Sequence, residues 1–266
     1  MRRTAQTRIR FCVLIASTCL AVSPLRGQET TDVAPAPSAR FPAAWYPPDS
    51  DVTYTMAPVK GAPYEARIIM AGQKPGLPSE QDPLQARDGA GRQRTETLQV
   101  RLDRDGRPIT VRAVEVSDPV THCGFQWGEP WVDKNQPTAT VSCMPRTLHY
   151  GAKPMWASVE SMQVAEEHPS SMETDRNEPL GERTFGGVRA TGVRHTRIIH
   201  AVQTGTPQTM VTEFWVSAEM KELVALNQEF PDGFNMELRD IKLREPDPKL
   251  FYPPADYKIV PAGTQP

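Results

Sequence analysis

The stretch from Gln208 to Val260 constrains the fold more than any other part of the chain, because apolar and polar residues alternate along it. Alternation with a period of two is typical of a β-strand that buries one face. The runs LVALNQEF and FNMELRDIKL flank Pro231-Asp232-Gly233, where proline fixes φ and glycine accepts a positive φ. The stretch therefore predicts an antiparallel meander, with a bulge near Arg239-Asp240 where the apolar residues change parity.

The tail after Leu243 is not predicted to continue the meander, because prolines stand at positions 246, 248, 253 and 254. Their spacing is incompatible with a ladder strand or a helix interior. Leu250, Phe251 and Tyr257 are the residues we expect to anchor this tail to the sheet. The tail is thus predicted to fasten the sheet and not to form a site.

The first 27 residues carry five arginines, no acidic residue and an apolar run from Phe11 to Val22. This pattern is typical of a secretory signal peptide, and the run is too short for a mature transmembrane helix. A lipid anchor on Cys19 is disfavoured, because Ala16-Ser17-Thr18 is a poor lipobox. We therefore expect a periplasmic or secreted protein that has no transmembrane helix after signal removal.

Composition divides the rest of the chain. Residues 28–60 are rich in Pro and Ala and are predicted to be a linker, residues 61–260 to be an antiparallel β domain, and residues 261–266 to be a tail. Within the linker, Trp45 and Tyr46 are interpreted as aromatics that attach it to the domain; docking on a partner or a sugar is the alternative.

Charge argues against one class of partner. Removing five arginines from 30 basic and 32 acidic residues leaves 25 against 32, a net charge of −7 for residues 28–266. Nucleic-acid binding needs a positive surface, so no nucleic-acid partner is expected. One basic cluster remains, and we interpret it as a solvated edge strand: Arg189, Arg194, His195, Arg197 and His200.

The middle of the chain predicts further strands and one helix. Tyr64–Met70 is a candidate strand, and Thr95–Leu102 forms a hairpin with the run Ile109 to Ala113 across an Asp103–Gly106 turn. Residues 181–200 predict two more strands around Gly186-Gly187. The helix is predicted over Lys153–Glu167, ended by His168-Pro169, whereas residues 72–92 and 169–180 are predicted to be loops.

The stretch from residue 118 to 150 contains Cys123 and Cys143, the two cysteines that remain after signal removal. In an oxidising compartment such a pair is most simply a disulfide. Two free thiols are one alternative, and a metal site that includes His122 and His149 is another. Structural zinc normally uses closely spaced ligand pairs, so we expect no metal.

No catalytic or cofactor motif is present in the sequence. The Gly-x-Ser-x-Gly and His-Glu-x-x-His patterns, the phosphate loop and the dinucleotide fingerprint are all missing. No pair of carboxylates stands in an apolar setting that would raise one pKa for acid catalysis. We therefore expect a protein that is not an enzyme and carries no cofactor.

Six short motifs resemble a group of secreted bacterial proteins, common in acidobacteria, to which no activity is assigned. They span roughly residues 64–260: Gly91-Arg92-x-Arg94-x-Glu96, Asp118-Pro119-Val120, Leu180-Gly181-x-Arg183, Gly187-Val188-x-Ala190-x-Gly192, Glu213-Phe214-Trp215-x-Ser217, and the closing motif from Glu245 to Tyr257. The closing motif is also similar to the C-terminal end of lipoprotein-carrier (LolA-like) proteins. That similarity implies an open antiparallel barrel around an apolar cavity. The cysteine pair and the two tryptophans between them, Trp127 and Trp131, depart from the pattern of the group.

The predicted fold is mainly β: an antiparallel curved sheet or open half-barrel with one or two short helices. The first functional hypothesis is an exported cell-envelope protein that binds an apolar ligand or lipid on the concave side of the sheet without catalysis. The residues predicted to line that site are Trp127, Trp131, Val100, Leu226, Phe230 and Met236. The alternatives are a structural or protein-interaction module with a filled core, whose partner is another envelope protein, and a hydrolase without a familiar motif.

Overall fold

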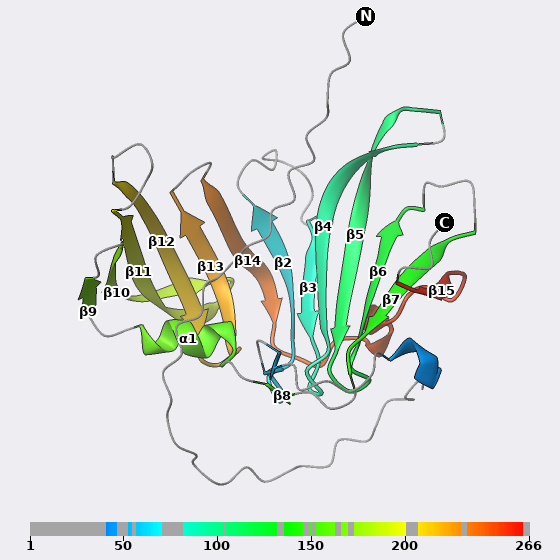
Figure 1. Cartoon of the computed structure of the whole chain (residues 1–266), viewed down its shortest axis with the longest axis horizontal. Coiled ribbons are helices and arrows are strands. Elements are labelled where there is room, and N and C mark those ends of the chain that lie inside the picture. The colour runs from blue at the N-terminus through cyan, green and yellow to red at the C-terminus, as the bar shows by residue number, and fades with distance from the viewer. Residues whose placement is uncertain are drawn as a thin grey trace, which may run out of the picture. The chain divides into compact units, whose positions relative to one another are not determined.

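The computed structural model in Figure 1 describes residues 41–46, 53–54, 57–70, 82–103, 105–131, 136–145, 149–150, 153–162, 166–169, 173–200, 207–229 and 233–262. The chain divides into two compact units, residues 1–34 and 35–266, and every described residue belongs to the second unit. The predicted signal peptide and the first part of the predicted linker lie outside the described residues.

The second unit is built almost entirely from strands. Its described residues form one α-helix, α1 (Met155–Ser161), and the short 3-10 turns η1 (Ala43–Trp45) and η3 (Pro248–Phe251). The strands are β1 (Thr53–Tyr54), β2 (Tyr64–Met70), β3 (Leu84–Arg87), β4 (Gln93–Leu102), β5 (Pro108–Asp118), β6 (Cys123–Glu129), β7 (Thr138–Cys143), β8 (His149–Tyr150), β9 (Glu166–Pro169), β10 (Glu173–Phe185), β11 (Val188–Ile199), β12 (Gln208–Ser217), β13 (Glu222–Gln228), β14 (Phe234–Lys242) and β15 (Lys258–Pro261).

One open sheet holds 13 of these strands in the order β15-β7-β6-β5-β4-β3-β2-β14-β13-β12-β11-β10-β9. Every pairing is antiparallel except that of β15 with β7 (Figure 1). The sheet does not close on itself, and it is half-barrel-like. The predicted fold class is therefore confirmed. β1 and β8 form a separate parallel pair.

The register assigns side chains to two faces, because residues paired directly across neighbouring strands share a face. We call the face that carries α1 the α1 face and the opposite one the tail face. Successive pairs place two rows on the α1 face: Val193, Phe214, Leu226, Met236 and Met70 in one, and Ala66, Gln85, Thr95, Glu115, Gln126 and Thr140 in the other.

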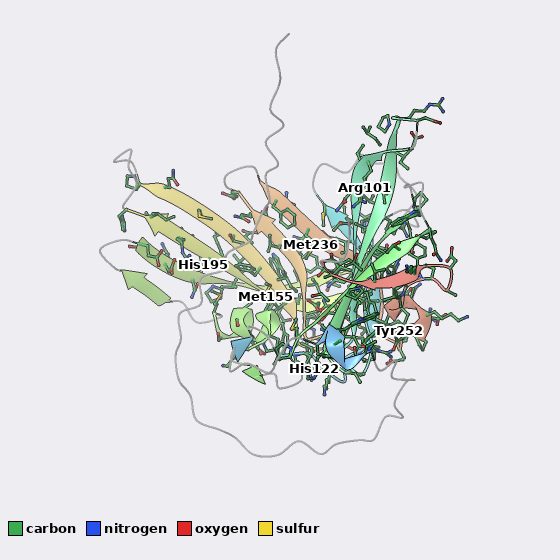
Figure 2. The ribbon with its side chains drawn as sticks, turned by 45° about the vertical axis from the view of Figure 1, so that its right-hand side comes forward. Arg101, His122, Met155, His195, Met236 and Tyr252 are labelled. Carbon is green, nitrogen blue, oxygen red and sulfur yellow. A yellow bond between two sulfur atoms is a disulfide. The ribbon has the colours of Figure 1, made fainter. Side chains whose placement is uncertain are left out.

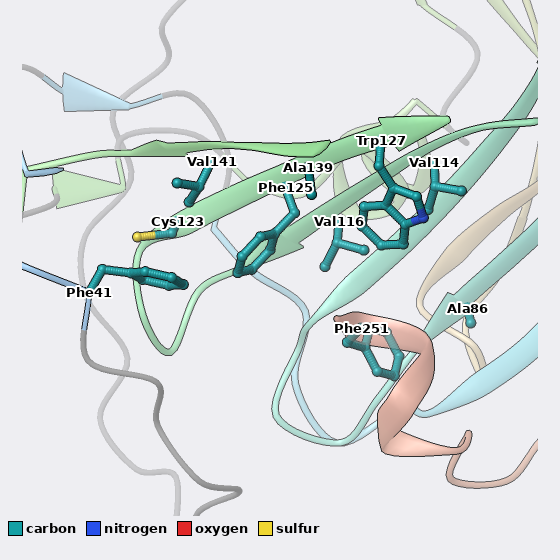
Figure 3. Close-up of a cluster of buried hydrophobic side chains, with 10 residues drawn as sticks. All are labelled: Phe41, Ala86, Val114, Val116, Cys123, Phe125, Trp127, Ala139, Val141 and Phe251. Carbon is teal, nitrogen blue, oxygen red and sulfur yellow. The ribbon is translucent and has the colours of Figure 1, made fainter. Parts of the chain in front are cut away.

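The tail face of β3 to β7 buries the main hydrophobic cluster, which Figure 3 shows. Strand residues of this cluster include Val114, Val116 and Phe125, and each alternates with a residue of the α1 face. Two distant segments cover them: Phe251 from η3, which is fully buried, and Phe41 beside η1, whose ring lies 5.5 Å from that of Phe125.

The C-terminal tail fastens the sheet as predicted. Leu250 and Tyr257 pack against the tail-face cluster beside Phe251, and the Tyr257 hydroxyl donates to the carbonyl of Gly128 at 2.7 Å. The expectation that the tail holds no ladder strand is wrong, because β15 pairs with β7. Its pairing begins only after Pro254, so the prolines themselves stay outside the ladder.

Three other boundaries differ from the sequence predictions. The helix is shorter than Lys153–Glu167, and residues 166–169 form the edge strand β9, where Pro169 needs no second ladder neighbour. The predicted loop 72–92 contains β3, and the predicted loop 169–180 contains the first eight residues of β10. The alternation in β3 is only four residues long, and this part of β10 lacks apolar alternation, so pairing with their neighbours decides their structure.

The predicted turns and the bulge are confirmed where the structure describes them. The Asp103 carboxylate accepts from the backbone N–H groups of Asp105 and Arg107 at 2.9 and 2.8 Å, which closes the β4–β5 hairpin. The β14–β2 register shifts between Arg239 and Lys242, and Asp240 has a positive φ. This is the bulge that the change of parity indicated.

Strand β3 contributes a buried arginine that joins distant segments. The Arg87 guanidinium donates to the carbonyls of Ala62, Met220 and Lys221, and it pairs with Glu222 Oε2 at 2.9 Å. Because Arg87 is only 2% exposed, these acceptors replace its hydration. The turn between β12 and β13 is thereby held against β2 and β3.

The Tyr64 side chain completes this network. Its hydroxyl donates to Glu222 Oε2 at 3.1 Å and accepts from Gln85 at 2.8 Å. Burial, and then the charge of Glu222, raise the pKa of Tyr64 well above its ordinary value, so the hydroxyl keeps its proton. Burial also raises the pKa of Glu222, although the Arg87 guanidinium opposes that shift.

Replacing Arg87 tests this network. Arg87→Met leaves Glu222 buried without its cation, so we expect a loss of about 3–5 kcal/mol in the free energy of unfolding. The matched control is Arg107→Met, because Arg107 is an exposed arginine of the β4–β5 hairpin. It should change the free energy by no more than about 0.5 kcal/mol. Urea unfolding measures both, and equal losses would contradict the role of Arg87.

Cys123 and Cys143 form the predicted disulfide, which joins β6 to β7 and closes a loop of 20 residues. Their sulfurs are therefore unavailable as the metal ligands that the alternative required. In the chain-entropy model a loop of this length stabilises the fold by about 3 kcal/mol. A disulfide fits an oxidising compartment outside the cytoplasm.

Reduction tests the contribution of the disulfide. A reductant should lower the unfolding free energy of the native protein by about 3 kcal/mol. The Cys123→Ser/Cys143→Ser variant should show the lower value with and without reductant. If reduction leaves the free energy of the native protein unchanged, the disulfide adds no stability.

Candidate ligand-binding surfaces

A methionine-rich surface lies beside α1 on the α1 face. The helix buries Val159 against Val193, Val216 and Leu223 of the sheet. Around that small core lie residues that are only partly buried, which we call the methionine surface: Met155, Met162, Phe214, Leu226 and Met236 (Figure 2). Met70 and Met210 extend it along the sheet, since Met70 pairs with Met236 and Met210 lies on the face of Phe214.

This surface is apolar and adaptable. Methionine side chains are unbranched and polarisable, so they can repack around ligands of different shape. At the helix, the indole N–H of Trp156 is buried, and none of the described residues offers it an acceptor. A buried donor without a partner is costly, and a ligand oxygen beside α1 would satisfy it.

A polar cluster borders the methionine surface on β10 and β11. Arg197 donates to both carboxylate oxygens of Asp175 at 2.8 and 3.0 Å, and the His195 ring bonds Asn177 at 2.9 Å. Burial lowers the pKa of His195, although Asp175 opposes the shift. His195 is therefore neutral at pH 7. It is labelled in Figure 2 and lies on the α1 face, as Phe214 does.

The interpretation of the basic cluster as an edge strand is wrong, because β11 pairs with β10 on one side and β12 on the other. Two of its arginines form ion pairs across those strands. Arg194 binds Glu213 at 2.8 Å, and Arg197 binds Asp175. This pairing offsets the charge of these two arginines.

A second candidate site is a groove of about 390 Å³ over β4 to β7. It also lies on the α1 face, where Thr97 pairs with Ala113 and Ala113 with Gly128. These short side chains leave the centre of the groove open. Its other polar lining residues are Thr95, Gln99, Arg101, Glu115, Gln126, Thr138 and Thr140.

The six residues predicted to line an apolar site fall in different places. Leu226 and Met236 are paired neighbours in the methionine surface, whereas Trp127 and Trp131 both line the groove. The Trp127 side chain also belongs to the tail-face cluster (Figure 3). Its indole N–H donates to Glu129 Oε1 at 2.6 Å. Val100 is 74% exposed near the end of the β4–β5 hairpin, and Phe230 lies outside the described residues.

The sequence interpretation missed several residues that shape these sites. The groove is built from Thr, Gln, Ala and Gly, which read as an ordinary solvated face. On the opposite, tail face, the buried ion pair of Glu96 with Arg94 at 2.6 Å on β4 had a usable signal. Arg92, Arg94 and Glu96 recur at a spacing of two, which puts all three on one face of a strand.

No known protein-family model matches the chain, and no curated protein matches it. Among the described residues, no helix is long and apolar enough to cross a membrane. Within the same residues, no three His, Cys, Asp or Glu side chains are grouped so that they could hold a metal ion.

His195 makes the stability of the sheet depend on pH. Its folded pKa lies below its unfolded value of 6.5, so its contribution is fully present above that value and is lost as the pH falls through the folded pKa. We expect the free energy of unfolding to drop less between pH 7.5 and pH 5 in His195→Gln than in the native protein. Urea unfolding at both pH values measures this, and identical pH dependence would contradict it.

Proposed function

We propose that this chain is an exported cell-envelope protein that binds an apolar ligand or lipid without catalysis. The acyl part of the ligand would lie on the methionine surface beside α1. The observation that carries the proposal is the partial burial of Met155, Phe214, Leu226 and Met236 around so small a helix. If these side chains served only to fill the interior of the domain, they would be fully buried.

Two further observations support the assignment. The Trp156 indole N–H, buried at α1 without an acceptor among the described residues, would donate to an ester or carboxylate oxygen of a lipid. The motif from Glu245 to Tyr257 resembles the corresponding end of lipoprotein-carrier (LolA-like) proteins. The predicted signal peptide and the disulfide are both in keeping with a periplasmic or secreted location.

Binding is favoured over catalysis because each buried arginine of the described residues pairs with a carboxylate. Arg87 pairs with Glu222, Arg92 with Asp88 at 2.5 Å, and Arg94 with Glu96. Such pairs hold segments together, and none leaves a base beside a nucleophile. The role of these charges is structural.

Lipid binding can be measured directly. Native mass spectrometry of protein purified from its own envelope should show a bound lipid. In solution, a BODIPY-labelled hexadecanoic acid should bind saturably, and Met236→Gln and Leu226→Gln should weaken binding about tenfold by adding polar groups to the apolar surface. The matched control is Val100→Gln, which adds the same group at an exposed position on the tail face.

Trp156→Phe refines the test, because it keeps an aromatic ring and removes only the N–H. It should lower affinity for the fatty acid while leaving the unfolding free energy unchanged or slightly higher. Repeated ligand-free spectra, or binding that the Met236 and Leu226 variants leave unchanged, would overturn the proposal.

A further inference from the structure

The groove over β4 to β7 differs in chemistry from the methionine surface. Six of its 13 lining residues carry a hydroxyl or amide group: Thr95, Thr97, Thr138, Thr140, Gln99 and Gln126. Among its lining residues the charged ones are Arg101 and Glu115, of opposite sign. The groove is therefore polar but electrically balanced, which disfavours an acidic or a basic ligand.

The arrangement of the polar side chains is regular. One row runs directly across four strands, from Thr95 through Glu115 and Gln126 to Thr140. Next to it, the shorter residues Thr97, Ala113 and Gly128 form the open floor. A Cβ on Gly128 would lie 3.1 Å from Val111 Cγ1, so the absence of that atom helps to keep the floor low.

An aromatic residue also lines this groove. Trp131 lines the groove just after β6, and its ring lies edge-on to Tyr257 at 6.0 Å between centroids. The Tyr257 hydroxyl is fixed to the Gly128 carbonyl, so the tail holds that contact in place. A flat indole beside hydroxyl and amide groups offers both an apolar surface and hydrogen-bond partners.

We infer that this groove binds a neutral oligosaccharide. Sugar hydroxyls both donate and accept hydrogen bonds, as the Thr hydroxyls and Gln amides do, and the C–H face of a sugar ring packs on an indole. A peptide strand has no ladder to join here, because β4, β5 and β6 each pair on both sides and β15 covers β7. The inference goes beyond the lipid proposal and does not depend on it.

The test uses maltohexaose, cellohexaose and the hexamer of N-acetylglucosamine with the native protein, followed by titration calorimetry and by NMR. At least one should bind with a Kd of about 1 mM or tighter. Trp131→Ala and Gln126→Ala should each weaken that binding about tenfold or more. Ala113→Met should abolish it by filling the floor of the groove.

The matched control is Val100→Ala, an exposed position of β4 on the opposite face, which should leave sugar binding unchanged. Urea unfolding shows whether the groove variants are folded, and their fatty-acid binding should equal that of the native protein. If none of the three hexamers binds, or if Trp131→Ala and Ala113→Met bind as well as the native protein, the inference is overturned.

Discussion

The guanidinium of Arg87 is the point at which distant parts of the chain meet. It satisfies carbonyls before β2 and in the β12–β13 turn, and its charge is balanced by Glu222. A buried cation with incomplete partners is costly, so these segments must assemble around it together. That requirement fixes how the two parts of the sheet, β15 to β3 and β14 to β9, are joined through β2. It therefore also determines which parts of the sheet faces stay exposed to solvent.

The fold class followed from simple alternation. The residues from Leu223 to Leu238 and the β4–β5 hairpin repeat with a period of two, and the cysteine pair had one simple interpretation in an oxidising compartment. The strand β3 could not be found in this way. Its sequence, LQAR, is only four residues long, and the polar Gln85 and Arg87 are buried together with Leu84 and Ala86. So short a run contains too little hydrophobic periodicity to identify a strand.

The candidate sites were harder to predict because both depend on register. Leu226 and Met236 were named from the sequence, but Met70 and Met210 lie beside them only because β2 pairs with β14 and β12 pairs with β13. In the groove, Thr and Gln are typical of any solvated strand. They become a site because Ala113 and Gly128 lie side by side, which depends on the register of β5 against β6.

The pairing of β2 with β14 has a consequence for how the protein matures. Met70 and Met236 are neighbours in the sheet, although almost the whole domain separates them along the chain. Closing so long a loop costs entropy before any contact compensates for it, which slows folding. The core cannot be completed until synthesis is nearly finished.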